Sequence, residues 1–96
     1  MLHMINKSPF ESKSLEDCLR YASDGSRILL YEDGIYGALA GSSHEARMKE
    51  IMSIHEVYVL KEDVALRGIE RLVEGVKEID YSGFVDLVEE SNAAAW

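Results

Sequence analysis

The sequence has few residues of several types, and each shortage excludes a class of protein. Its 96 residues include one cysteine, one proline and one tryptophan. A single cysteine excludes an internal disulfide, and the N-terminus has no basic stretch ahead of an apolar one, so we expect a protein of the reducing cytoplasm. Because no apolar run approaches the roughly 20 residues that a membrane-spanning helix needs, we expect no membrane span.

Basic residues are also few, and they are scattered along the chain. Ten lysines and arginines stand against 18 aspartates and glutamates, which gives a formal net charge of −8, and no two basic residues are adjacent. A DNA or RNA site needs a positive footprint, so we expect no direct nucleic-acid partner. We interpret the acidic surface as one that keeps the protein soluble.

The length predicts one domain, spanning residues 1–96. Apolar residues make up 47% of the chain, which excludes disorder. A domain of this size buries only about two-thirds of the surface that its unfolded chain exposes, so its stability is expected to depend on partners. The tyrosines and the tryptophan outnumber the obvious core positions and favour an interface.

Four segments are expected to be strands, namely Leu2–Asn6, Ile28–Tyr31, Val57–Leu60 and Val76–Tyr81. The second and third are continuous apolar runs, which are typical of strands covered on both faces of a parallel sheet. We therefore expect these two at the centre of the sheet. The last residues, Asn92–Trp96, are expected to form a short tail.

Helical patterns lie between the strands. A short helix is expected at Ile35–Leu39, and other helices are expected where a residue can begin or cap the first turn. Those residues are Ser14, Ser42 with Glu45 as a capping box, Asp63 ahead of Val64, and Ser82. The alternation predicts an α/β fold, a small three-layer αβα domain with a four-stranded, mainly parallel sheet.

Motifs for phosphate, cofactor or metal binding are missing. No glycine-rich phosphate loop is present, and the three histidines His3, His44 and His55 lie too far apart to form a metal-ligand spacing with one cysteine. We therefore predict neither a cofactor nor a metal. Glu32 and Asp33 follow an expected strand, where ligand sites of open α/β sheets gather. A turn aspartate is the favoured alternative to a metabolite site there.

Cys18 is the one reactive candidate. It falls early in the first expected helix, and thiolates are stabilised near helix N-termini. Glu16 and Asp17 oppose this effect, since nearby negative charge raises a thiol pKa, whereas nearby basic residues pull the other way. The alternative is a packing role, because Cys18 shares an apolar stripe with Leu15 and Ala22.

Several segments resemble the DsrH/TusB family, and they run in order over nearly the whole chain. They are Leu2-His3, Asn6–Phe10, Leu30–Tyr36, Val57–Leu60, Ala65–Gly68, Asp80–Leu87 and Ala95-Trp96. The segment Ser14–Leu19 places Cys18 where DsrH proteins of sulfur oxidisers carry a cysteine in the first helix. TusB proteins of the tRNA-thiolation relay often lack that cysteine.

The resemblance implies a DsrEFH-like fold and a role in a sulfur-relay complex. In the family, this subunit joins DsrE-like and DsrF-like subunits in a heterohexamer with two copies of each. The complex passes persulfide sulfur to a DsrC/TusE-type carrier, and the principal persulfide cysteine lies on the DsrE/TusD subunit. This chain is then an accessory subunit of a sulfurtransferase, with Cys18 as a secondary persulfide acceptor.

Two questions stay open at the level of sequence. The first is the pathway, where Cys18 favours dissimilatory sulfur oxidation and a TusB-like role in tRNA 2-thiouridine synthesis is the alternative. The second is the role of the chain, which is either a sulfur-carrying subunit, a non-catalytic scaffold, or a self-associating protein that binds a metabolite near Asp33.

Overall fold

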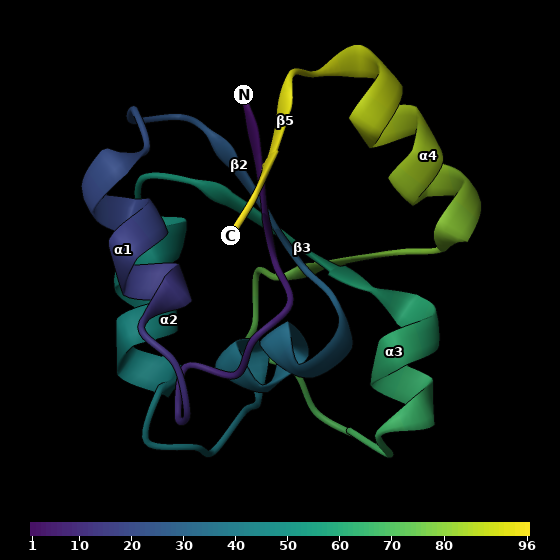
Figure 1. Ribbon diagram of the computed structural model, residues 1–96. Coiled ribbons are helices and arrows are strands. Elements are labelled where there is room, and N and C mark those ends of the chain that lie inside the picture. The colour runs from purple at the N-terminus through teal and green to yellow at the C-terminus, as the bar shows by residue number, and fades with distance from the viewer.

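Strands and helices alternate along the chain in a computed structural model of residues 1–96 (Figure 1). The strands are β1 (Leu2–Ile5), β2 (Arg27–Leu30), β3 (Glu56–Leu60), β4 (Lys77–Ile79) and β5 (Ala93–Ala95). The helices are α1 (Ser14–Tyr21), the 3₁₀ helix η1 (Glu32–Ala38), α2 (Glu45–Met52), α3 (Lys61–Leu66) and α4 (Tyr81–Glu90). None of these helices is long and apolar enough to span a membrane.

All strands join one parallel sheet in the order β4-β3-β2-β1-β5. The predicted α/β fold is confirmed, and β2 and β3 lie in the interior of the sheet, as their continuous apolar runs predicted. The parallel register pairs His3 with Ile28 and Ile28 with Val57. Three neighbouring strands thereby present matching rows of side chains to the helices.

The expected number of strands was wrong, because the C-terminal segment is a fifth strand rather than a tail. β5 pairs with β1, with Ala93 opposite Leu2 and Ala95 opposite Met4. Its ends are held by backbone hydrogen bonds from Leu2 N to Asn92 O (2.9 Å) and from Trp96 N to Met4 O (3.0 Å). Three alanines carry no hydrophobic alternation, so only the neighbouring strand makes this segment extended.

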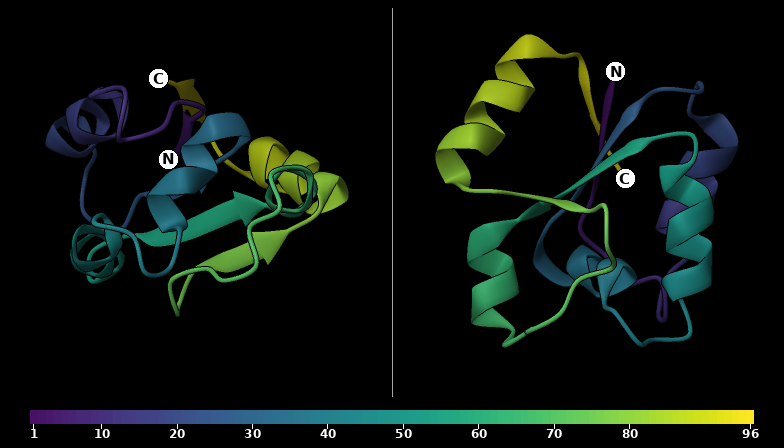
Figure 2. Two further views of the ribbon diagram at one scale, coloured as in Figure 1. Left: turned by 90° about the horizontal axis from the view of Figure 1, so that it is seen from below. Right: turned by 180° about the vertical axis from the view of Figure 1, so that it is seen from behind.

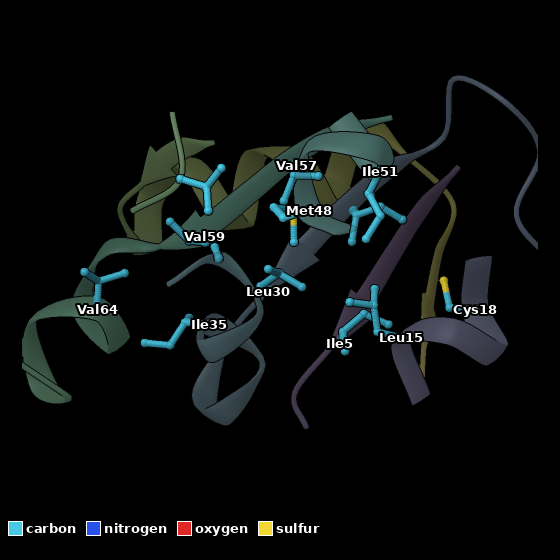
Figure 3. Packing of buried hydrophobic residues seen from close by; sticks show 13 residues of the cluster. Ile5, Leu15, Cys18, Leu30, Ile35, Met48, Ile51, Val57, Val59 and Val64 are labelled. Atoms are coloured by element: carbon cyan, nitrogen blue, oxygen red, sulfur yellow. The ribbon is translucent and has the colours of Figure 1, made fainter. Parts of the chain in front are cut away.

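Helices cover both faces of the sheet, which gives the three layers that the pattern predicted. The larger core lies on the face that contacts α1, α2, η1 and α3, and its strand residues include Ile5, Leu30 and Val59 (Figure 3). The smaller core lies on the other face, where Leu2 and Leu29 pack against Leu87 of α4. Both views in Figure 2 show α1 and α2 close together and far from α4.

Two helix starts differ from the expectation. Lys13, not Ser14, precedes α1, and the Ser14 amide donates to Ser12 Oγ at 3.1 Å. In the last helix, Asp80 caps α4, because its Oδ1 accepts from the Gly83 amide at 2.8 Å, so Tyr81 is helical and Ser82 is not the first residue. In both helices the observed start lies slightly ahead of the expected one.

The other two expected caps act differently as well. Glu45 Oε1 accepts from the Gly41 amide at 2.8 Å, and Ser42 Oγ accepts from the His44 amide at 3.2 Å. A capping box would instead pair Glu45 with the Ser42 amide and Ser42 Oγ with the Glu45 amide, so the expected capping box does not form. Asp63 lies inside α3, which begins at Lys61. Its carboxylate accepts instead from the Glu32 amide at 2.6 Å, a partner 31 residues away.

The chain turns sharply where β2 enters η1. Glu32 has a φ of +47°, a left-handed conformation that costs a non-glycine residue about 1 kcal/mol. Two residues later, Gly34 approaches β1 so closely that a Cβ on it would lie 2.2 Å from the Ile5 carbonyl oxygen. Only glycine permits this approach, which packs η1 over the carboxyl end of the sheet.

Candidate functional site

Cys18 lies on the buried face of α1, where the apolar spacing of the helix places it. It is fully buried and belongs to the same core cluster as Ile5 and Leu15 (Figure 3). This burial raises the pKa of the Cys18 thiol to about 11. Such a thiol is deprotonated in about one molecule in ten thousand at pH 7, so the geometry favours the packing role over a reactive one.

The charged neighbours of Cys18 in the sequence are engaged elsewhere. Asp17 pairs with Arg20 on the exposed side of α1. Glu16 accepts two hydrogen bonds from Arg47 of α2, each 2.9 Å long. These bonds from Arg47 hold the pKa of Glu16 below its ordinary value. The Glu16–Arg47 pair therefore connects α1 to α2, and burial is the cause of the raised pKa of the Cys18 thiol.

Polar side chains gather at the carboxyl end of β1, β2 and β3. Asn6 donates to Glu32 at 3.2 Å, and Arg67, the residue after α3, donates to Asp33 at 3.0 Å. Arg67 also lies 3.5 Å from Asp63, which accepts from the Glu32 backbone. Asp33 thus has a cationic partner within the chain, so these contacts fit the turn-aspartate interpretation better than a metabolite site.

The three histidines lie at separate places. His44 Nδ1 lies 2.7 Å from the Gly37 carbonyl, and its Nε2 is buried without a hydrogen-bond partner. His55 Nδ1 lies 2.9 Å from the Ser26 carbonyl, and His3 is on β1. No group of three or more histidine, cysteine, aspartate or glutamate side chains is placed to hold a metal ion.

The largest cavity, of about 340 Å³, lies at the opposite end of the sheet. It is lined by Met1, His3, Tyr21, Ser23, Asp24, Gly25 and Ser26. Beside it, Trp96 Nε1 donates to His3 Nδ1 at 3.0 Å, and the Trp96 ring lies 5.8 Å from the Tyr21 ring. Sequence reasoning missed this site, because Tyr21, His3 and Trp96 belong to three different elements and share no motif.

Comparison with known proteins places the chain among DsrH-like proteins. The family described as DsrH like protein matches residues 7–94. Protein TusB of Pectobacterium parmentieri is 37% identical over 98 aligned residues, which cover all of both chains. Protein TusB of Escherichia coli O81 (strain ED1a) is 34% identical, also over the whole of both chains.

Solved structures share the fold at lower identity. The ychN protein from E. coli has a TM-score of 0.79 at 20% identity, covering 99% of this chain and 97% of that one. A protein of unknown function from Methanobacterium thermoautotrophicum has a TM-score of 0.75 at 14% identity, covering 99% and 96%. These likenesses support the architecture alone, whereas the full-length sequence matches show that this chain belongs to the DsrH/TusB family.

Proposed function

We propose that this protein is a subunit of a cytoplasmic sulfur-relay complex of the TusBCD/DsrEFH type. The observation that carries the proposal is the match to TusB proteins at 34–37% identity over the whole chain. By analogy with the family, the chain assembles with DsrE-like and DsrF-like subunits, two copies of each, and the complex passes persulfide sulfur to a DsrC/TusE-type carrier.

The relatives named TusB favour the tRNA-thiolation pathway over sulfur oxidation. In that pathway the relayed sulfur ends in 2-thiouridine of tRNA. Dissimilatory sulfur oxidation is the second candidate, and Cys18 is the residue that favours it, since DsrH proteins of sulfur oxidisers carry a cysteine in the first helix. The two pathways differ in the final acceptor and share the persulfide chemistry.

Within the complex, the chain acts mainly as an accessory subunit. The burial of Cys18 and its raised pKa support a packing role in the resting protein. Persulfide transfer would need the Cys18 thiolate to attack the outer sulfur of a donor persulfide, which forms a new S–S bond and releases the donor thiolate. Such an attack would require α1 to move, so the acceptor role of Cys18 stays a prediction.

Exposed apolar side chains support association with partners. Six large apolar residues have exposed fractions between 49% and 79%, namely Met1, Phe10, Tyr21, Ile54, Leu66 and Tyr81. They include residues at both ends of the sheet, since Ile54 O accepts from Gly25 N at the amino end and Tyr81 N donates to Glu62 at the carboxyl end. Aromatic side chains and methionine are enriched at protein–protein interfaces.

Complementation tests the pathway. In a bacterium lacking its own TusB, this chain should restore 2-thiouridine in tRNA, measured by mass spectrometry of digested nucleosides. The Leu30→Asp variant, which places a charge at a fully buried position, is the inactive control. If the wild-type chain co-purifies with its partner subunits but leaves tRNA unthiolated, the TusB pathway is wrong, and loading of a DsrC-type carrier becomes the measurement.

A mass experiment on the assembled complex tests the role of Cys18. If Cys18 accepts sulfur, a persulfide donor adds the mass of one sulfur atom to this subunit, and dithiothreitol removes it. The Cys18→Ser variant should lose that mass and still assemble. If the partner cysteine loads fully while Cys18 stays unmodified, the subunit is a scaffold.

A further inference from the structure

The cavity beside β1 has a polar floor that the proposed relay function does not use. It lies beside the first residues of β1, the end of α1 and the turn that leads into β2. Its volume of about 340 Å³ falls in the range of small-molecule sites. His3, on this floor, is only 2% exposed.

The His3 ring provides one hydrogen-bond donor, and its hydrogen bond to Trp96 identifies the nitrogen that carries the proton. Because His3 Nδ1 accepts the Trp96 Nε1 proton, the proton of the neutral imidazole is on Nε2. His3 Nε2 forms no hydrogen bond within the chain and is not among the fully buried unpartnered atoms, and His3 is one of the residues that line the cavity. Burial, the N-terminal ammonium and His55 lower the pKa of His3, so the ring is neutral at pH 7.

The walls add an acceptor and an aromatic surface. Ser23 and Asp24 are exposed on the turn after α1, and the Asp24 carboxylate forms no ion pair within the chain. Tyr21 is 75% exposed, and its ring centroid lies 5.8 Å from that of Trp96 in a tilted arrangement. The cavity therefore combines a neutral N–H donor, a carboxylate acceptor and a flat apolar wall.

We propose that this cavity binds a small, neutral, planar ring compound whose edge presents a carbonyl acceptor and an N–H donor, as an aromatic carboxamide does. The carbonyl accepts from His3 Nε2, the amide N–H donates to Asp24, and the ring stacks on Tyr21. A carboxylate in the same place would face the Asp24 carboxylate, and like charges repel. The site uses neither Cys18 nor the carboxyl end of the sheet, and its Tyr21 wall is exposed in the isolated chain, in which it is tested.

Benzamide is the probe, titrated into the ¹⁵N-labelled full chain with amide chemical shifts as the readout. A fragment of this size is expected to bind with a Kd of about 1–10 mM. Shifts should concentrate at the amide of His3, on the turn that follows α1 and at the indole N–H of Trp96. Fluorescence of Trp96, the one tryptophan of the chain, gives an independent titration.

Two exposed variants test the walls without touching the core. Tyr21→Ala and Asp24→Ala should each raise the Kd for benzamide at least about fivefold. The matched controls, Tyr81→Ala and Asp86→Ala, change exposed residues of α4 and should leave the Kd unchanged.

Three outcomes would overturn the proposal. The first is the absence of any shift at 20 mM benzamide, a concentration chosen at about twice the weakest expected Kd. The second is benzoate binding as tightly as benzamide, which would show an anion site. The third is binding that both wall variants leave unchanged, which would place the probe elsewhere.

Discussion

Trp96, the last residue, donates its indole N–H to the Nδ1 atom of His3 at 3.0 Å and so joins the two ends of the chain. The bond spans 93 positions in sequence. It also holds β5 beside β1, where three alanines provide little side-chain packing. The pair therefore carries part of the stability of the sheet edge.

Removing the indole N–H should destabilise the protein. In Trp96→Phe, the buried His3 Nδ1 loses its donor, and a buried unpaired acceptor costs about 1–3 kcal/mol. Urea denaturation measures the change. The control is Tyr21→Phe, which removes a hydroxyl that forms no hydrogen bond in the chain and should cost less than about 0.5 kcal/mol. Equal losses in both variants would contradict a role for the bond.

Stability should fall as the pH drops below about 6.5, the ordinary pKa of histidine. Burial lowers the pKa of His3 in the folded protein, so over this range the unfolded chain binds a proton before the folded one does. The free energy of unfolding then decreases with falling pH until the folded pKa is passed. Protonated His3 also cannot accept from Trp96.

The pH effect can be assigned to one residue. In His3→Gln, the free energy of unfolding should depend less on pH between about 7 and 5 than it does in the wild type. Urea midpoints at a series of pH values measure this slope. A slope that the substitution leaves unchanged would assign the pH dependence to other groups.

Cys18 should react slowly in the isolated folded protein. Its burial and its pKa of about 11 leave little accessible thiolate, so modification by a disulfide reagent should be limited by unfolding or local opening. Absorbance of the released thiol follows the reaction, and the chain unfolded in guanidinium is the control. Rapid, stoichiometric reaction of the native chain would show that α1 opens easily and would favour the acceptor role.

Glycine should fit position 32 better than any other residue. Glu32 has a φ of +47°, and its backbone N–H donates a hydrogen bond to the Asp63 carboxylate. Glu32→Gly should therefore be more stable than Glu32→Ala by about 1 kcal/mol, since both lose the side chain and alanine alone keeps the strain. Thermal unfolding compares the two variants. Equal stability would mean that the turn relaxes when the side chain is removed.

The local pattern predicted the parts of the structure that local chemistry controls. Ile28–Leu30 and Val57–Leu60 form interior strands because a continuous apolar run is stable only when both faces are covered. Cys18 falls on the buried face of α1 because it follows Leu15 at helical spacing. The α/β architecture follows from the alternation of such segments, and the family resemblance was visible in the same residues.

The tertiary structure alone decided the features that depend on distant partners. Ala93–Ala95 forms a strand only because β1 offers its free edge, and Glu32 adopts a positive φ beside Asp63. His3 and Trp96 meet because the parallel register brings β5 next to β1. Hydrogen bonds between residues far apart in sequence leave no periodic signal, so the pattern of residues along the chain did not reveal these features or the cavity beside them.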